Sequence, residues 1–131
     1  MITVPEDVEV HESPGGKWWV KNDILYSLGK KDPPRLSPDE EVEEMKRFKK
    51  VVGDRKICMI LDITYAKPAD KNDRDRAAVE LEKLVKAMAM VTISPLGRMV
   101  ANLFFGLKPP NYPVKMFSNV EDAEKWIKQY V

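Results

Sequence analysis

The stretch KICMILD, residues 56–62, sets five consecutive apolar residues between a lysine and an aspartate. A short apolar run bounded by charges is typical of a strand that is buried on both faces of a sheet. A second run, AMAMVTI at residues 87–93, has the same character. We therefore expect Ile57–Leu61 and Ala87–Ile93 to lie side by side and parallel in the middle of a sheet.

Helical periodicity predicts four helices around these strands. Ser37, Pro38 and Glu40 form a capping box with a proline in the first turn, and Gly53 ends that helix. Further helices are expected over Arg74–Lys86, over Leu96–Leu107 after the Ser94-Pro95 cap, and after a second capping box at Ser118 and Glu121. The expected buried residues of the four helices are, in order, Val42, Met45, Phe48 and Val52; Ala77, Ala78, Leu81, Leu84 and Val85; Leu96, Met99, Val100, Leu103, Phe104 and Leu107; and Ala123, Trp126, Ile127 and Tyr130.

The amino-terminal part has a different pattern. Residues 1–28 favour a β-meander in which Val8 and Val10 lie on a strand, with turns at residues 13–16 and 22–23. Residues 29–37 are interpreted as a linker, and residues 38–131 as an alternating α/β core that includes a strand at 114–117. The prediction is a single α/β domain over residues 1–131, whose mixed sheet has parallel inner strands and antiparallel amino-terminal edge strands.

Composition limits the classes of function. Lys plus Arg (22) and Asp plus Glu (21) almost cancel, so we expect neither nucleic acid nor an anionic membrane as a partner. Apolar runs fall short of the roughly 20 residues that span a bilayer, and no charged-then-apolar leader opens the chain. With a single cysteine, Cys58, an internal disulfide is excluded. The expectation is a cytoplasmic protein without a cofactor.

Several segments together resemble a known superfamily. They are residues 57–62, AMAMV at 87–91 leading to Ser94-Pro95, NLFF at 102–105 followed by Lys108-Pro109, YPVKMF at 112–117 and EDAEKWI at 121–127. The chain resembles the STAS-like, or SpoIIAA-like, bacterial anti-sigma factor antagonists, which border the lipid-binding SEC14 fold. It is most similar to an uncharacterised bacterial branch of STAS/SEC14 domain proteins.

The resemblance implies a non-enzymatic regulatory or ligand-binding module. The best-known relatives bind protein partners and are switched by phosphorylation of a serine that follows the central strand. Here the corresponding stretch, ITYAKPADKND at residues 63–73, contains no serine. The resemblance therefore predicts the fold and a protein partner, but not this switch.

One pattern suggests phosphoryl chemistry. Asp62, Thr92 and Ser94 lie near the carboxyl ends of predicted strands, where open sheets bind ligands, and Lys115 lies in the middle of the last strand. Such a phosphoacceptor site needs a metal, and the second acidic residue expected beside it is missing. In the simpler interpretation, Asp62 caps a turn and Ser94 caps a helix.

A small anionic ligand is a further hypothesis. The stretch from Ser94 to Arg98 includes Gly97, and it combines the exposed amides of a helix start with a guanidinium group. An ordinary helix cap with a surface arginine has the same sequence pattern. Both interpretations stay open from sequence alone.

The other polar residues favour structural roles. The mixed charges at residues 70–76 fit solvated ion pairs at a helix start. His11 is the only histidine, and no nucleophile elbow accompanies it, so zinc binding and serine hydrolase chemistry are not expected. Cys58, inside an apolar strand, fits inert packing. We predict no metal site and no enzyme activity.

Aromatic residues and methionines suggest two kinds of binding surface. Adjacent aromatics on a strand point to opposite sides, so either Trp18 or Trp19 should stay exposed, and Phe105 and Tyr112 are further candidates for a contact between two copies. A homodimer is the expected assembly. Alternatively, methionines line an adaptable pocket for a lipid or another apolar molecule between the sheet and the Leu96–Leu107 helix.

Overall fold

The sheet has its strands in chain order, β1-β2-β3-β4-β5-β6, in a computed structural model that describes residues 2–105 and 109–131. The strands in this described part are β1 (His11–Ser13), β2 (Gly16–Lys21), β3 (Ile24–Gly29), β4 (Ile57–Asp62), β5 (Val85–Val91) and β6 (Val114–Phe117). The helices there are α1 (Pro38–Val52), α2 (Lys71–Leu84), α3 (Pro95–Phe105) and α4 (Val120–Ile127), followed by a 3-10 turn at Lys128–Tyr130.

The two apolar runs form the centre of the sheet, as the sequence predicts. β4 pairs in parallel with β5, and Met59 lies opposite Met88 in the register. β3 and β6 are also parallel to their inner neighbours, whereas β1 and β2 are antiparallel and form the amino-terminal edge. The predicted mixed α/β architecture with four helices is confirmed.

β5 spans Val85–Val91, so it is shifted by two residues toward the amino terminus from the predicted strand at Ala87–Ile93. Val85 pairs with Ile57 and Ala87 pairs with Cys58, so Lys86 lies in a bulge between them. The bulge leaves the Lys86 side chain exposed while Val85 on one side and Ala87 on the other are buried. The sequence pattern places Val85 and Lys86 at the end of a helix. In the structure both belong to the start of β5, where the bulge accommodates the charged lysine.

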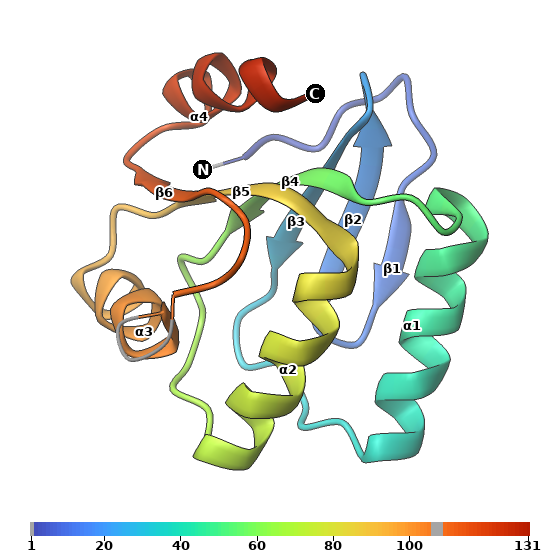
Figure 1. Ribbon diagram of the computed structural model, residues 1–131, viewed down its shortest axis with the longest axis vertical. Helices are drawn as coiled ribbons and strands as arrows, with labels where there is room; N and C mark the ends of the chain where they lie inside the picture. The colour runs from blue at the N-terminus through green and yellow to red at the C-terminus, as the bar shows by residue number, and fades with distance from the viewer. Residues whose placement is uncertain (1, 106–108) are drawn as a thin grey trace.

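The helices divide between the two faces of the sheet. Three successive parallel crossovers run in the same direction, which places α1, α2 and α3 on one face. α4 and the amino-terminal segment cover the other face (Figure 1). Each face has its own apolar core. Residues Leu25, Met59, Met88 and Met90 pack toward α1–α3, and Trp19, Cys58, Ile60, Ala89 and Val91 pack toward α4.

The amino-terminal segment differs from the prediction before His11. Val8 and Val10 lie outside β1, but both still pack against the core on the α4 face. The β2–β3 hairpin turns at Asn22 and Asp23, whose φ angles are 54° and 61°. Two consecutive left-handed residues define a type I′ turn, which matches the twist of the strands that it joins.

Helix starts follow the capping rules with one shift. Ser37 and Glu40 form the predicted capping box of α1, and Gly53, with φ 80°, ends that helix. α4 begins one residue later than predicted, because Asn119 is its cap and accepts a hydrogen bond from the Asp122 N–H. The Ser118 hydroxyl is therefore not the cap of α4, and it accepts a hydrogen bond from Arg98 instead.

Candidate functional site

α3 approaches the sheet through its smallest residues. Gly97 and Ala101, one helical turn apart, are the buried residues of this helix. A Cβ atom at Gly97 would lie 2.6 Å from the Thr92 Oγ1 atom and 3.0 Å from the Ile63 carbonyl oxygen. The close approach of α3 to the ends of β4 and β5 therefore requires glycine at this position.

The larger apolar residues of α3 consequently face outward. Leu96, Met99 and Leu103 are 49%, 47% and 49% exposed, and Ile93, just before the helix, is 75% exposed. We call these four residues the apolar face of α3. They are four of the nine large hydrophobic residues that are exposed in the described part of the chain, and they fall within eleven consecutive positions.

This result corrects the sequence-based expectation for α3. Leu96, Met99 and Leu103 were expected to be buried, and only Val100 and Phe104 of that stripe are partly buried; Leu107 lies outside the described residues. Ile93 was expected inside a strand and is instead largely exposed. The signal that could have identified the buried side was the pair Gly97 and Ala101, since small residues four apart mark a close approach.

A cavity of about 360 Å³ lies beside α3, between this helix and the β5–β6 edge of the sheet. Apolar side chains dominate its lining: Met90, Ala101, Phe105, Pro109, Pro110, Tyr112, Val114 and Met116. Asn102 contributes a polar side chain, whereas Lys115, also at the lining, directs its ammonium group toward Phe117 on the other face of the sheet. Burial, and then the Glu82 carboxylate, raise the pKa of Tyr112 to about 12. A cavity at this place fits the expectation of an apolar pocket between the sheet and this helix.

Asp62 has a structural role. Its Oδ2 atom accepts a hydrogen bond from the Ile2 N–H at 3.1 Å, and its Oδ1 atom accepts one from the Thr64 N–H at 3.0 Å. The side chain is buried, and it joins the amino-terminal segment to the end of β4. The turn-capping interpretation of Asp62 is therefore the correct one.

The alternative interpretation, a phosphoacceptor group around Asp62, does not assemble. Side chains alternate along a strand, so Asp62 lies on the same face as Cys58 and Ile60, which pack toward α4, whereas α3 covers the opposite face. The Thr92 Oγ1 atom accepts a hydrogen bond from the Ser94 N–H at 3.0 Å, and Lys115 Nζ lies 5.5 Å from the centre of the Phe117 ring. Asp62 is thus separated from the hydroxyl groups that the sequence placed beside it.

The start of α3 is an ordinary cap with one long-range contact. The Ser94 Oγ atom accepts a hydrogen bond from the Gly97 N–H at 3.3 Å. The exposed Arg98 guanidinium donates to the Ser118 Oγ atom at 3.2 Å, which links α3 to the start of α4. Ser94, Gly97 and Arg98 therefore lie together as predicted, with each in a contact that serves the fold.

The aromatic residues expected at a contact between two copies lie mostly inside the chain. Trp19 and Tyr112 are 1% and 7% exposed, so Trp18 is the less buried of the two adjacent tryptophans and the expectation of a surface role is wrong for Tyr112. Trp18 is half-buried, stacked on His11 and next to Phe48 of α1. Phe105 is half-buried and lines the cavity. Four exposed aliphatic residues lie instead on α3 or just before it.

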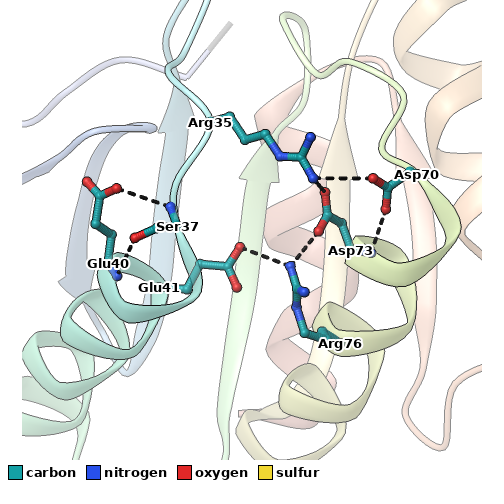
Figure 2. Close-up of polar contacts among 7 residues, drawn as sticks. All are labelled: Arg35, Ser37, Glu40, Glu41, Asp70, Asp73 and Arg76. Carbon is teal, nitrogen blue, oxygen red and sulfur yellow. Dashed lines mark hydrogen bonds and ion pairs between the residues drawn. The ribbon is translucent and has the colours of Figure 1, made fainter.

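A network of ion pairs joins the starts of α1 and α2 (Figure 2). Asp70 caps α2 by accepting a hydrogen bond from the Asp73 N–H. Arg35, in the connection between β3 and α1, contacts the Asp70 and Asp73 carboxylates at 3.3 and 3.2 Å. Arg76 contacts Asp73 and reaches Glu41 of α1 at 3.6 Å. The interpretation of residues 70–76 as solvated ion pairs at a helix start is correct, and the pairs to Arg35 and Glu41 are additional.

The α2 cap lies after the central strand β4, in the region where the resemblance places a phosphorylated serine. Asp70, not a serine, occupies the start of the helix that follows β4. The hydrogen bond from the Asp73 N–H, and then the charges of Arg35 and Arg76, lower the pKa of Asp70 below its usual value. A carboxylate that is charged at neutral pH therefore occupies this helix start.

Other reactive side chains are engaged or enclosed. Burial raises the pKa of the Cys58 thiol, which is 1% exposed. In the described ranges no three His, Cys, Asp or Glu side chains gather in a group that could hold a metal ion. The helices in those ranges are also too short or too polar to cross a membrane.

Comparison with known proteins places the chain in a family. A family model described as Domain of unknown function (DUF7793) matches residues 18–131, and the chain belongs to this family. A search of curated proteins found no match.

Among solved structures, the chain is similar to an uncharacterized protein of the DUF3478 family, with a SpoIIAA-like fold, from Shewanella loihica PV-4. The two share 18% identity over 91% of this chain and 90% of the other, with a TM-score of 0.50. The likeness shows the fold, and the protein has the SpoIIAA-like, or STAS-like, architecture that its sequence suggests.

Proposed function

We propose that the protein is a non-enzymatic, regulatory protein-interaction module of the STAS-like type, and that it binds its partner through the apolar face of α3. The observation that carries this proposal is the exposure of Leu96, Met99 and Leu103 on one side of α3, together with that of Ile93 just before the helix. Contiguous exposed apolar side chains are costly in water and mark interaction surfaces more often than chance. The helix nevertheless keeps a close contact with the sheet through Gly97, so the face is presented on a rigid support.

The polar residues support a binding role over catalysis. Both carboxylate oxygens of Asp62 accept backbone hydrogen bonds, and Cys58 is enclosed in the core. His11, the one histidine, stacks on Trp18 with ring centroids 4.2 Å apart. Each of these groups is thus occupied in folding contacts, and a nucleophile paired with a base is not assembled from them.

Site-specific photo-crosslinking tests this proposal. A photoreactive amino acid is placed at Leu96 or Leu103, with Val42 as the control, because Val42 is 53% exposed but lies on α1. We expect covalent protein adducts in living cells from positions 96 and 103 and few from position 42. Equal yields at all three positions would contradict the proposal, and mass spectrometry of the adduct identifies the partner.

A second candidate function is the binding of an amphipathic small molecule in the cavity beside α3. Its volume of about 360 Å³ falls within the range of roughly 300 to 1,000 Å³ that is usual for ligand pockets. The lining side chains are mostly apolar, with the Asn102 amide and the Tyr112 hydroxyl as polar groups, so the cavity suits a molecule with an apolar body and a polar head group that accepts hydrogen bonds.

Native mass spectrometry with a medium-chain fatty acid as the probe tests the second candidate. We expect a bound species of one-to-one stoichiometry in the unaltered protein. Met116→Trp fills the cavity and should abolish this species, whereas Met99→Trp, on the outer side of α3, should leave it unchanged. Binding that is equal in both variants, or absent from the unaltered protein, removes support from the cavity.

A further inference from the structure

A second cavity, which we call the β3 cavity, lies where β3 ends, at the other end of the sheet from the cavity beside α3. Its volume is about 330 Å³, within the range of roughly 300 to 1,000 Å³ that is usual for ligand pockets. The amino-terminal segment, the β1–β2 hairpin, the end of β3 and the connection after β4 all line it. β3 and β4 are parallel neighbours, so their carboxyl ends meet at this edge, which is where open sheets bind ligands.

Glycine keeps one wall of the β3 cavity free of side chains. Gly16 pairs with Gly29 in the register of β2 and β3, and both residues line the cavity. The φ angle of Gly16 is 150°, and a Cβ atom there would lie 2.1 Å from the Leu28 carbonyl oxygen. A larger residue at position 16 would push the two strands apart, so this bare wall is a property of the backbone.

Two lysines give the β3 cavity a net positive charge. Lys17 lines it beside Glu12, with 3.7 Å between the Lys17 Nζ and Glu12 Oε1 atoms. Lys30 also lines it, and its backbone N–H donates to the Gly15 carbonyl oxygen at 2.9 Å, which holds this residue against the hairpin turn. Within the described part of the chain, the Lys30 ammonium group is in no ion pair, and Glu12 is the one acidic residue of the lining.

An aromatic ring and two aliphatic side chains form the apolar part of the β3 cavity. Tyr65, in the connection after β4, is 39% exposed, whereas Tyr26 and Tyr112 are both 7% exposed. Among the residues that the structure describes, none forms a hydrogen bond with the Tyr65 hydroxyl. Val4 and Leu28 line the cavity and pack against the core on the α4 face. The cavity therefore offers an apolar surface and a phenol donor next to its two ammonium groups.

We propose that the β3 cavity binds a small organic anion that has an apolar body and a phosphate or carboxylate head group. The ammonium groups of Lys17 and Lys30 attract the head group, and the Tyr65 ring covers the apolar body. A lysine binds an anion as a point charge at the end of a flexible chain, so either head group is suitable. The inference goes beyond the proposed function, because α3 contributes no residue to this cavity.

A titration with phenyl phosphate, followed by the amide signals in NMR spectra, tests the proposal. The signals of Gly16, Gly29 and Tyr65 should shift along a saturable curve, while the signals of α3 stay in place. Added salt should weaken the binding, because Lys17 and Lys30 are both exposed. The absence of saturable shifts at these three signals, for phenyl phosphate and for benzoate, would overturn the proposal.

Two smaller probes separate the head group from the apolar body. Phenol lacks the negative charge, and inorganic phosphate lacks the ring, so each should bind about tenfold more weakly than phenyl phosphate or not at all. Inorganic phosphate that binds as tightly as phenyl phosphate would show that the ring is not recognised. Phenol that does so would show that the charge is not recognised, and either result contradicts the proposed class of ligand.

Lys30→Met and Lys31→Met form a matched pair of variants. Each removes one exposed lysine from the same connection, but Lys30 lines the β3 cavity and Lys31 does not. Lys30→Met should weaken the binding of phenyl phosphate by roughly threefold to tenfold, and Lys31→Met should leave it unchanged. Equal losses in both variants would mean that the charge of the whole surface attracts the anion, and the assignment to this cavity would be wrong.

Tyr65→Ala removes the aromatic part of the cavity and should weaken the binding of phenyl phosphate by roughly threefold to tenfold. Unchanged binding in this variant would contradict the placement of the apolar body on the ring. Thermal unfolding of all three variants is expected near that of the unaltered protein, because the altered side chains are exposed. Lost binding is then distinguished from lost folding.

Discussion

α3 and α4 are both short amphipathic helices that pack against the sheet, but they use their apolar residues in opposite ways. α4 turns Ala123 and Ile127, each 0% exposed, into the core, and the Tyr26 hydroxyl donates a hydrogen bond of 2.6 Å to the Glu124 carboxylate. α3 buries Gly97 and Ala101 and leaves its leucines in solvent. The apolar side of α4 is therefore buried in the core, whereas Leu96, Met99 and Leu103 of α3 are exposed to solvent.

The difference follows from residue size at the point of contact. α3 comes so close to Thr92 and Ile63 that a single Cβ atom would not fit at Gly97. Large side chains cannot enter that interface and are directed outward. α4 has no such restriction at Ile127, and a large side chain there fills the space above β4 and β5.

The largest effect is expected from truncating the buried side of α4. Ile127→Ala should lower the free energy of unfolding by about 2 to 5 kcal/mol, because it removes a fully buried side chain and leaves a cavity. Chemical denaturation measures this loss. A loss below about 1 kcal/mol would mean that α4 contributes little to the core, and the contrast with α3 would fail.

The Asp62 carboxylate is the next largest contribution, on the same face of the sheet. Asp62→Ala leaves the buried N–H groups of Ile2 and Thr64 without their acceptor, at a cost of about 1 to 3 kcal/mol. Hydrogen exchange should show the amino-terminal segment losing protection before the strands do. In Asp62→Asn one acceptor oxygen remains, so an intermediate loss is expected, and equal stability of all three proteins would refute this role.

Gly97→Ala should cost about 1 to 3 kcal/mol, because its methyl group would overlap the Thr92 side chain and push α3 away from the sheet. Ala101→Gly is the matched control, since it relaxes the same contact and costs about 1 to 2 kcal/mol through helix propensity and the loss of a buried methyl group. If Gly97→Ala is neutral or stabilising, the close approach does not determine how α3 is oriented.

The raised pKa of Tyr112, which lines the cavity beside α3, predicts that the stability of the protein falls at alkaline pH. Its pKa in the folded protein is about 12, above the ordinary value of 10.0, so the folded state holds the phenol proton more tightly. The resulting stability is fully present below pH 10 and is lost as the pH rises toward 12. Tyr112→Phe should flatten this decline in urea unfolding. Parallel curves for both proteins would show that Tyr112 does not contribute to it.

The smallest effect is expected on the outer side of α3. Leu103→Ser should change the free energy of unfolding by no more than about 0.5 kcal/mol at low protein concentration, because the side chain is 49% exposed. Thermal unfolding provides the measurement, with Ile127→Ala as the reference. A loss comparable to that of Ile127→Ala would place Leu103 in the core.

The strands could be predicted from sequence because their signals are local. The apolar runs at 57–61 and 87–93 identify the central strands, and the Ser37-Pro38-Glu40 capping box sets the start of α1. The bulge at Lys86 could not be foreseen, since it depends on the pairing of Val85 with Ile57 across the sheet. Tertiary pairing thus overrides the helical pattern at the end of α2.

The candidate site could be predicted only in part. The sequence correctly groups Ser94, Gly97 and Arg98 at one helix start, but it cannot tell on which face of the sheet the Asp62 side chain lies. It also assigns Leu96, Met99 and Leu103 to the core, because periodicity shows that a helix is amphipathic without showing which side is turned inward. The small size of Gly97 and Ala101 is the feature of the sequence that indicates which side of α3 faces the sheet.

The most direct test of the account uses methionine methyl signals in the presence of a soluble nitroxide, at a low protein concentration. Met99 is 47% exposed on the outer side of α3, while Met88 is 1% exposed on β5. The account predicts strong paramagnetic relaxation of the Met99 methyl group and protection of the Met88 methyl group. Equal protection of both would place Met99 in the core, and the surface on which the proposed function rests would not exist.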